Sequence, residues 1–205
     1  MPGKRGERAV LDALGPLWPA LQTFCVERRR ELAGRDRDDR FSDVDLESLL
    51  SFEMGVYWRT PESPPWYPYD ATPSNSFTFA HTGVDGEHFS VLLAEAPFGV
   101  VVMTCPACDT ENIVVGETLE EFLRLGCVGG YGASPNLAIV DAERAISAIK
   151  KEPDEGRDPA WGTDPSECLR ALGEELSLTP WSDIEARLGY LEDRYRRDVV
   201  RGGPP

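Results

Sequence analysis

No stretch of this 205-residue sequence approaches the ~20 consecutive apolar residues that a transmembrane helix requires. The first residues are basic, but the apolar segment after them is interrupted by Asp12 and by two prolines. It therefore contains neither the uninterrupted apolar core of a secretory signal nor a cleavage site. These absences predict a cytoplasmic protein without a membrane-spanning segment.

Cysteine and histidine are also scarce. The sequence has five cysteines, an odd number at irregular spacing, and two histidines, His81 and His88. In a chain without a secretion signal this pattern does not predict a disulfide framework, so we expect reduced thiols.

Basic side chains are nearly missing from the middle of the chain. Residues 41–133 contain fourteen acidic side chains and two basic ones, Arg59 and Arg124, and the whole chain has a net charge of −15. Such a region would repel a nucleic-acid backbone and attract a basic protein. An acidic surface that serves only solubility is the alternative interpretation.

The most informative stretch that is present runs over residues 77–93, where two apolar-rich segments flank a turn. Gly83 and Gly86 tolerate positive φ, and Asp85 can bond its own backbone, so a β-hairpin is predicted. Alternation of apolar and polar residues predicts strands that are half buried. Further apolar runs at 99–104 and 113–115 extend the hairpin to a meander over about 76–115.

Helical patterns flank this meander on both sides. They are expected at 20–32, whose Arg28, Arg29 and Arg30 form a solvated end, and at 44–54, whose Leu46, Leu49, Leu50 and Phe52 supply core contacts. Thr118 and Glu121 form a capping box for a helix that Gly126 ends. Three more helices are predicted to open at Ser134, at Asp164 and Pro165, and at Thr179 and Pro180. The fold class is therefore α+β, a short antiparallel meander covered by N-terminal and C-terminal helices.

Residues 59–73 contain five prolines and the aromatic residues Trp66, Tyr67 and Tyr69. The prolines exclude a helix or a central strand and favour an ordered extended loop. Its aromatic rings either cover the core or contact a partner, since tyrosine and tryptophan are frequent at binding hot spots.

Cys105 and Cys108 form the one short Cys-x-x-Cys pair, a spacing that is found in metal sites. Zinc would need two more ligands, for which His81, His88 and Cys127 are the candidates, so a tight turn with partly buried thiols is the favoured interpretation.

No amphipathic helix follows the pair as a thioredoxin-type site requires, and no nucleophile elbow or phosphate-binding motif is present. The sequence therefore predicts no catalytic group, no cofactor and no enzyme.

One set of motifs resembles a known family. The FAHTG and DGEHF limbs of the hairpin, the VVMT strand and the helix VGETLEEFLRLG are similar to the bacterial SUKH superfamily, over about residues 58–131. The chain departs from common members in lacking an early Leu-Pro plus Asn-Gly-Gly segment and in its long C-terminal helical region. The resemblance implies a SUKH-like domain over residues 1–150, with a C-terminal helical extension over 151–205 packed on the same domain.

That superfamily unites toxin-immunity proteins with a fungal cell-wall-assembly regulator. The resemblance implies an immunity protein that masks a cognate bacterial toxin, for which the acidic charge favours a basic, nuclease-like partner. A regulatory scaffold is one alternative, and a metal-binding enzyme module on His81, His88, Cys105 and Cys108 is another. The predicted contact surface combines the hairpin tip, the aromatic loop and an acidic helix start: Thr82, Asp85, Glu87, Trp66, Tyr67, Tyr69, Glu117, Glu120 and Glu121.

Overall fold

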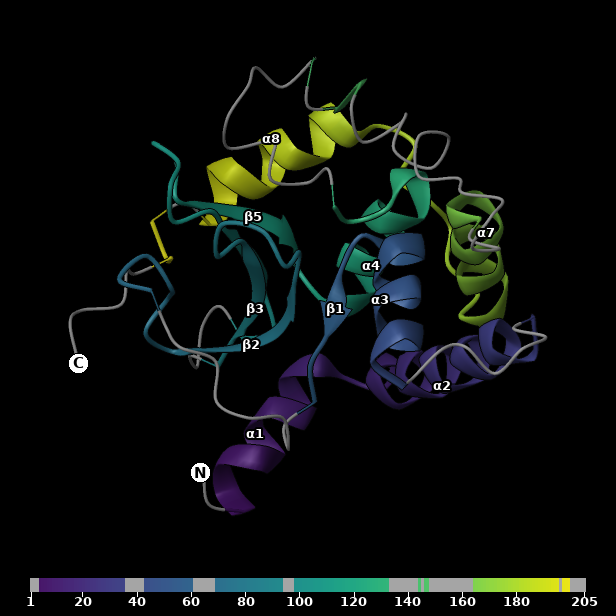
Figure 1. The fold of residues 1–205 in the computed structure, drawn as a ribbon. Helices are drawn as coiled ribbons and strands as arrows, with labels where there is room; N and C mark the ends of the chain where they lie inside the picture. Colours follow the sequence, from purple (N-terminus) through teal and green to yellow (C-terminus); the bar gives the residue numbers. More distant parts are fainter. Residues whose placement is uncertain are drawn as a thin grey trace.

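The structure is a computed structural model that describes residues 4–35, 43–60, 69–93, 98–132, 144, 146–147, 164–195 and 197–199. Within these residues the chain is α+β, with six helices and one five-stranded antiparallel sheet (Figure 1). The elements in chain order are α1 (Lys4–Leu14), α2 (Leu17–Arg35), α3 (Asp43–Met54), β1 (Tyr57–Trp58), β2 (Ser76–His81), β3 (His88–Leu92), β4 (Val101–Thr104), β5 (Asn112–Gly116), α4 (Leu119–Gly129), α7 (Pro165–Glu175) and α8 (Ile184–Tyr195).

The sheet is a meander in the order β1-β2-β3-β4-β5, which confirms the predicted topology. The predicted hairpin is also confirmed: His81 of β2 lies opposite His88 of β3, and Gly83 and Gly86 have φ of 84° and 77°. The two-residue strand β1, which pairs with the end of β2, was not predicted. It is too short to carry an alternation pattern.

The prediction that the hairpin strands are half buried is wrong for β3, because both of its faces are buried. Phe89 packs on Phe122 of α4, with ring centroids 4.9 Å apart. On the opposite face His88 and Ser90 are also inaccessible to solvent, and each has a polar partner. The Thr78 and Ser90 hydroxyl oxygens lie 3.0 Å apart, and His88 Nε2 lies 3.1 Å from Thr72 Oγ1. Hydrogen bonding within the protein is what permits this polar row to be buried.

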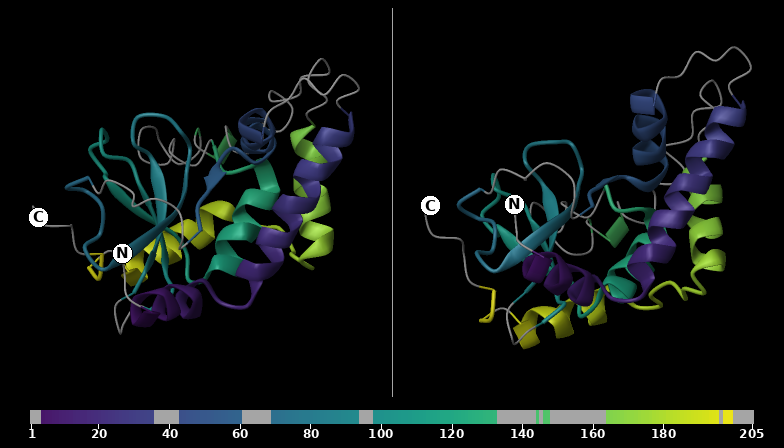
Figure 2. Two further views of the ribbon diagram at one scale, coloured as in Figure 1. Left: turned by 60° about the horizontal axis from the view of Figure 1, so that its bottom comes forward. Right: turned by 90° about the horizontal axis from the view of Figure 1, so that it is seen from below.

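The helices form two groups around the sheet. Helices α2, α3, α4 and α7 lie together on one side, as both views of Figure 2 show. Helix α1 packs near β3, and α8 runs along the edge strand β5. Between the sheet and the first group lies an aromatic cluster of Trp18, Trp58, Phe79, Phe122 and Tyr131.

The N-terminal helices are more extensive than predicted. Helix α1 was not predicted, and α2 begins at Leu17, with Pro19 inside the first turn, where a proline costs no helical hydrogen bond. Gly15, at φ 73°, separates the two helices. Among the described helices, none alone has the length and apolar character to cross a membrane. Residues 8–14 and 17–34 meet that test only as a pair bent by 84°.

Helix α4 shows the predicted N-terminal cap but not the predicted end. Thr118 Oγ1 accepts a hydrogen bond from the backbone N–H of Glu121, which confirms the capping residue. The prediction that Gly126 ends the helix is wrong, since α4 continues to Gly129 and Gly130 caps it at φ 85°. Gly126 lies inside the helix. A glycine is required at this position because the ring of Tyr131 occupies the space that any side chain would fill. This glycine serves close packing.

For the C-terminal helices one predicted start is confirmed and another is wrong. Asp164 accepts a hydrogen bond from the backbone N–H of Glu167 and Pro165 begins α7, as predicted. The start of the last helix was placed too early: α8 begins at Ile184, after Asp183 accepts a hydrogen bond from the N–H of Ala186. The helix predicted to open at Ser134 begins outside the described residues.

A buried ion pair joins the first group of helices. Arg28 of α2 is 4% exposed and donates two hydrogen bonds, from Nε and Nη2, to the carboxylate of Glu53 in α3, both of 2.7 Å. The backbone N–H of Asp164, before α7, also donates to Glu53. The prediction that Arg28 belongs to a solvated helix end is therefore wrong. Helical spacing places Arg28 on the same face as Leu21 and Leu32, which are both buried.

The variant Arg28→Met is expected to destabilise the fold by about 3–5 kcal/mol, because it leaves the Glu53 carboxylate buried without its cation. The free energy of unfolding from urea titration measures this. The matched control is Arg170→Met, which breaks the exposed α7 pair of Arg170 and Glu174 and should cost at most ~0.5 kcal/mol. Equal losses in the two variants would contradict a special role for the buried pair.

Candidate protein-binding site

An open groove of about 650 Å³ lies where the β2–β3 hairpin turns. Its walls come from the end of α3, the hairpin tip, the end of α4 and the start of α7. The lining residues are Ser51, Phe52, Glu53, Met54, Gly55, Tyr57, Thr82, Gly83, Val84, Glu87, Gly129, Gly130, Gly132, Pro165 and Leu169. Several glycines among them leave the groove wide, because they add no side chain to its walls.

The hairpin tip is held in shape by its own hydrogen bonds. The backbone N–H of Glu87 donates to the carbonyl of Val84, and the N–H of Thr82 donates to the carbonyl of Glu87. The Thr82 hydroxyl donates to Glu87 Oε2 over 3.0 Å and accepts from the N–H of Val84. Asp85 has a φ of 45°, a conformation that aspartate tolerates better than most residues. The tip is therefore a preformed turn.

Two tyrosines support this tip from outside the hairpin. Tyr57 of β1 stacks on His81 at 5.2 Å between ring centroids, and its ring lies directly against Gly83. Tyr69 stacks on His88 at 6.0 Å and occupies the space over Gly86. The end of the predicted aromatic loop thus meets the hairpin tip, whereas Trp66 and Tyr67 lie outside the described residues.

Two large apolar side chains in the groove lining are exposed to solvent, Phe52 at 70% and Val84 at 56%. The assignment of Phe52 to the core is wrong. At ~100° per residue Phe52 lies about 120° away from the centre of the apolar stripe of α3, and that centre is occupied by Glu53. Helical periodicity therefore contained the signal for an outward Phe52, and the sequence interpretation missed it.

The charge of the site comes from the hairpin tip. Asp85 is exposed and Glu87 half-buried. Partial burial raises the pKa of Glu87 above its usual value, the hydrogen bond from Thr82 opposes this rise, and the charge of Asp85 adds to it. Glu53, in the groove wall, is neutralised by Arg28. The groove therefore combines two exposed apolar side chains with the carboxylate of Glu87 in its lining and that of Asp85 on the adjoining hairpin tip.

The acidic helix start lies elsewhere. Glu117 directly follows Gly116, which pairs with Val101, whereas the hairpin tip is level with Thr104 at the other end of β4. The four residues of β4 separate these two levels by about 10 Å along the strand. The predicted surface is thus divided between the two ends of the sheet.

Glu117 and Glu121 are engaged inside the molecule. Both accept hydrogen bonds from the guanidinium of Arg187 in α8, and the Tyr195 hydroxyl donates to Glu117 over 2.7 Å. That hydrogen bond, followed by the interaction with Arg187, lowers the pKa of Glu117. These carboxylates hold α8 against the β5–α4 junction, and only Glu120 of the three is fully exposed.

The alternative metal site is not assembled. The structure joins Cys105 and Cys108 in a disulfide, which corrects the expectation of a reduced pair. No group of three or more histidine, cysteine or acidic side chains arranged to hold a metal ion occurs among the described residues. Cys25, Cys127 and Cys168 are free, and burial raises the pKa of the first two to about 12 and about 11.

Searches of protein-family models, of curated proteins and of solved structures found no match to this chain. The class that fold and site define is thus an α+β protein with an open, partly apolar groove beside an acidic hairpin tip.

Acidification is expected to destabilise the protein before its carboxylates titrate. Burial lowers the pKa of His81 to about 4, helped by the charges of Arg59 and His88, and burial also lowers the pKa of His88 from 6.5. The unfolded state therefore binds more protons below pH 6.5, so the free energy of unfolding should fall as pH drops towards about 5.

Urea midpoints measured across this interval test the expectation. The double variant His81→Asn, His88→Asn should show a smaller slope of stability against pH, even if it is less stable at pH 7. A slope equal to that of the wild type would contradict the assignment to the two histidines.

Proposed function

We propose that this chain is a non-catalytic protein-binding module, an immunity protein of the SUKH type that neutralises a basic toxin by masking its surface. The observation that carries the proposal is the preformed groove with Phe52 and Val84 exposed in its lining beside Asp85 and Glu87. Large exposed apolar side chains that gather at one groove mark interaction sites more often than scattered ones do.

The chemistry of the groove defines the partner. An apolar or aromatic side chain of the partner would enter between Phe52 and Val84, where burial excludes water. Lysine or arginine side chains around that anchor would face Asp85 and Glu87 at the rim. The net charge of −15 would accelerate the approach of a basic protein over a longer range. A regulatory scaffold would use the same surface for a cellular protein, so the identity of the partner separates the two functions.

The first test identifies the partner and then removes the anchor. Proteins retained by the chain from its own cells are identified, and the complex is rebuilt from purified components. Phe52→Ala should weaken binding by about tenfold or more, because it removes the central apolar contact. The control is Phe98→Ala, which truncates an exposed phenylalanine outside the groove lining.

Co-expression supplies the functional readout. If the partner is a toxin, the wild-type chain should restore growth of cells that produce it, and the Phe52→Ala variant should restore less. A partner that is not toxic would support the scaffold function. A complex indifferent to Phe52→Ala would remove the groove from the proposal.

Charge reversal separates the two acidic regions. The double variant Asp85→Lys, Glu87→Lys should slow association roughly tenfold at low salt, because rim charges act mainly on the association rate. Glu120→Lys, at the far end of the sheet, should have a much smaller effect. Stopped-flow association rates at two ionic strengths measure both. The double variant changes the net charge twice as much as Glu120→Lys, so an effect on the logarithm of the rate only about twice as large would show that only net charge matters.

A further inference from the structure

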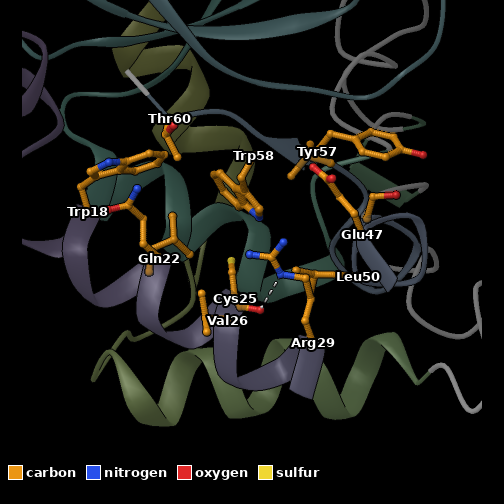
Figure 3. A pocket seen from close by; sticks show the side chains of 13 residues that line it. Trp18, Gln22, Cys25, Val26, Arg29, Glu47, Leu50, Tyr57, Trp58 and Thr60 are labelled. Atoms are coloured by element: carbon orange, nitrogen blue, oxygen red, sulfur yellow. Dashed lines mark hydrogen bonds between the residues drawn. The ribbon is translucent and has the colours of Figure 1, made fainter. Parts of the chain in front are cut away.

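A second hollow, of about 170 Å³, shares Ser51 and Tyr57 with the lining of the groove. Figure 3 shows the side chains that line it. It is bounded by α2, by α3 and by the chain around β1. Its lining residues are Trp18, Leu21, Gln22, Cys25, Val26, Arg29, Glu47, Leu50, Ser51, Val56, Tyr57, Trp58 and Thr60. Nothing in the proposed masking of a toxin uses this pocket.

The pocket has an aromatic and aliphatic lining. The rings of Trp18 and Trp58 meet edge to face, with centroids 6.5 Å apart, and Leu50 and Val56 are buried beside them. Trp18 is 1% exposed, and its indole N–H makes no hydrogen bond within the described part of the chain. Such a lining favours a flat apolar ring, and a buried indole N–H is a donor available to a polar group.

One cation enters this apolar space. Figure 3 shows the Arg29 side chain rising from α2 beside Cys25 and Leu50 towards Trp58. Its Nε donates a long hydrogen bond of 3.4 Å to the Cys25 carbonyl, and it forms no ion pair with a carboxylate of the described residues. Arg28, the preceding residue, is by contrast paired through two hydrogen bonds with Glu53. Arg29 therefore keeps most of its donors for another acceptor.

We propose that this pocket binds a small aromatic carboxylate, with its ring against Trp18 and Trp58 and its carboxylate on the Arg29 guanidinium. The size is suitable, since an apolar cavity of about 150 Å³ accommodates benzene. The planar fork of arginine matches a carboxylate, and an apolar surrounding strengthens the charge-assisted hydrogen bonds. Glu47 lies exposed at the rim and disfavours a second negative charge on the ligand.

Benzoate and phenylacetate are the probes. Calorimetric titration should give saturable binding, and the NMR signal of the Trp58 indole N–H should shift in proportion to occupancy. Benzamide, which has the same shape without the charge, should bind about tenfold more weakly, the factor that corresponds to ~1.4 kcal/mol. This comparison uses only the wild-type protein, so it does not depend on the folding of a variant.

The variant Arg29→Met removes the charge and keeps most of the aliphatic stem. It should weaken benzoate binding about tenfold and leave benzamide binding unchanged. The matched control is Arg30→Met, because Arg30 is exposed and absent from the pocket lining, and it should bind benzoate like the wild type. Absence of saturable benzoate binding, equal affinity for benzamide, or equal losses in the two variants would overturn the proposal.

Discussion

The buried pair of Arg28 and Glu53 is the interaction on which the rest of the structure depends. It joins α2 to α3, and the N–H of Asp164 adds the start of α7 to the same carboxylate. Such a pair is costly to desolvate, so its main consequence is geometric: it allows one rotation of each helix about its axis. Any other rotation would bury one charge without its partner.

This geometric constraint extends to both candidate sites. Successive side chains of a helix diverge by ~100°, so the residue next to an inward one must point elsewhere. With Arg28 directed at α3, Arg29 is directed into the small pocket; with Glu53 directed at α2, Phe52 is directed outward beside the hairpin tip. One ion pair thus places the cation of the pocket and the apolar anchor of the groove.

The hairpin contributes the other half of the groove by a different mechanism. Its shape comes from local hydrogen bonds among Thr82, Val84 and Glu87, and its position comes from the tyrosine rings packed against Gly83 and Gly86. A side chain at either glycine would displace those rings, and both glycines also have positive φ. The tip is rigid because turn chemistry and packing require the same conformation.

The sequence by itself determined the elements whose signals are local: the meander, its Gly-rich turn, and the caps at Thr118 and Asp164. A cap or a turn needs only residues within a few positions, so one segment contains all its information. Interior Gly126 was missed because a glycine marks a helix end only when nothing packs against it, and the ring of Tyr131 does. The start of α8 was expected too early because Asp183, and not Thr179, supplies its cap. The tip residues and Tyr69 were brought together as expected, while Phe52 was missed.

Only the tertiary structure decided which charges are free. A count of acidic residues treats Asp85, Glu117 and Glu53 alike, yet the first is exposed, the second binds Arg187 and Tyr195, and the third is buried on Arg28. Each of those partners is at least 25 residues away along the chain. Helical periodicity indicates which charges point inward, but the partner that each one meets lies far away along the chain, and no local pattern identifies it.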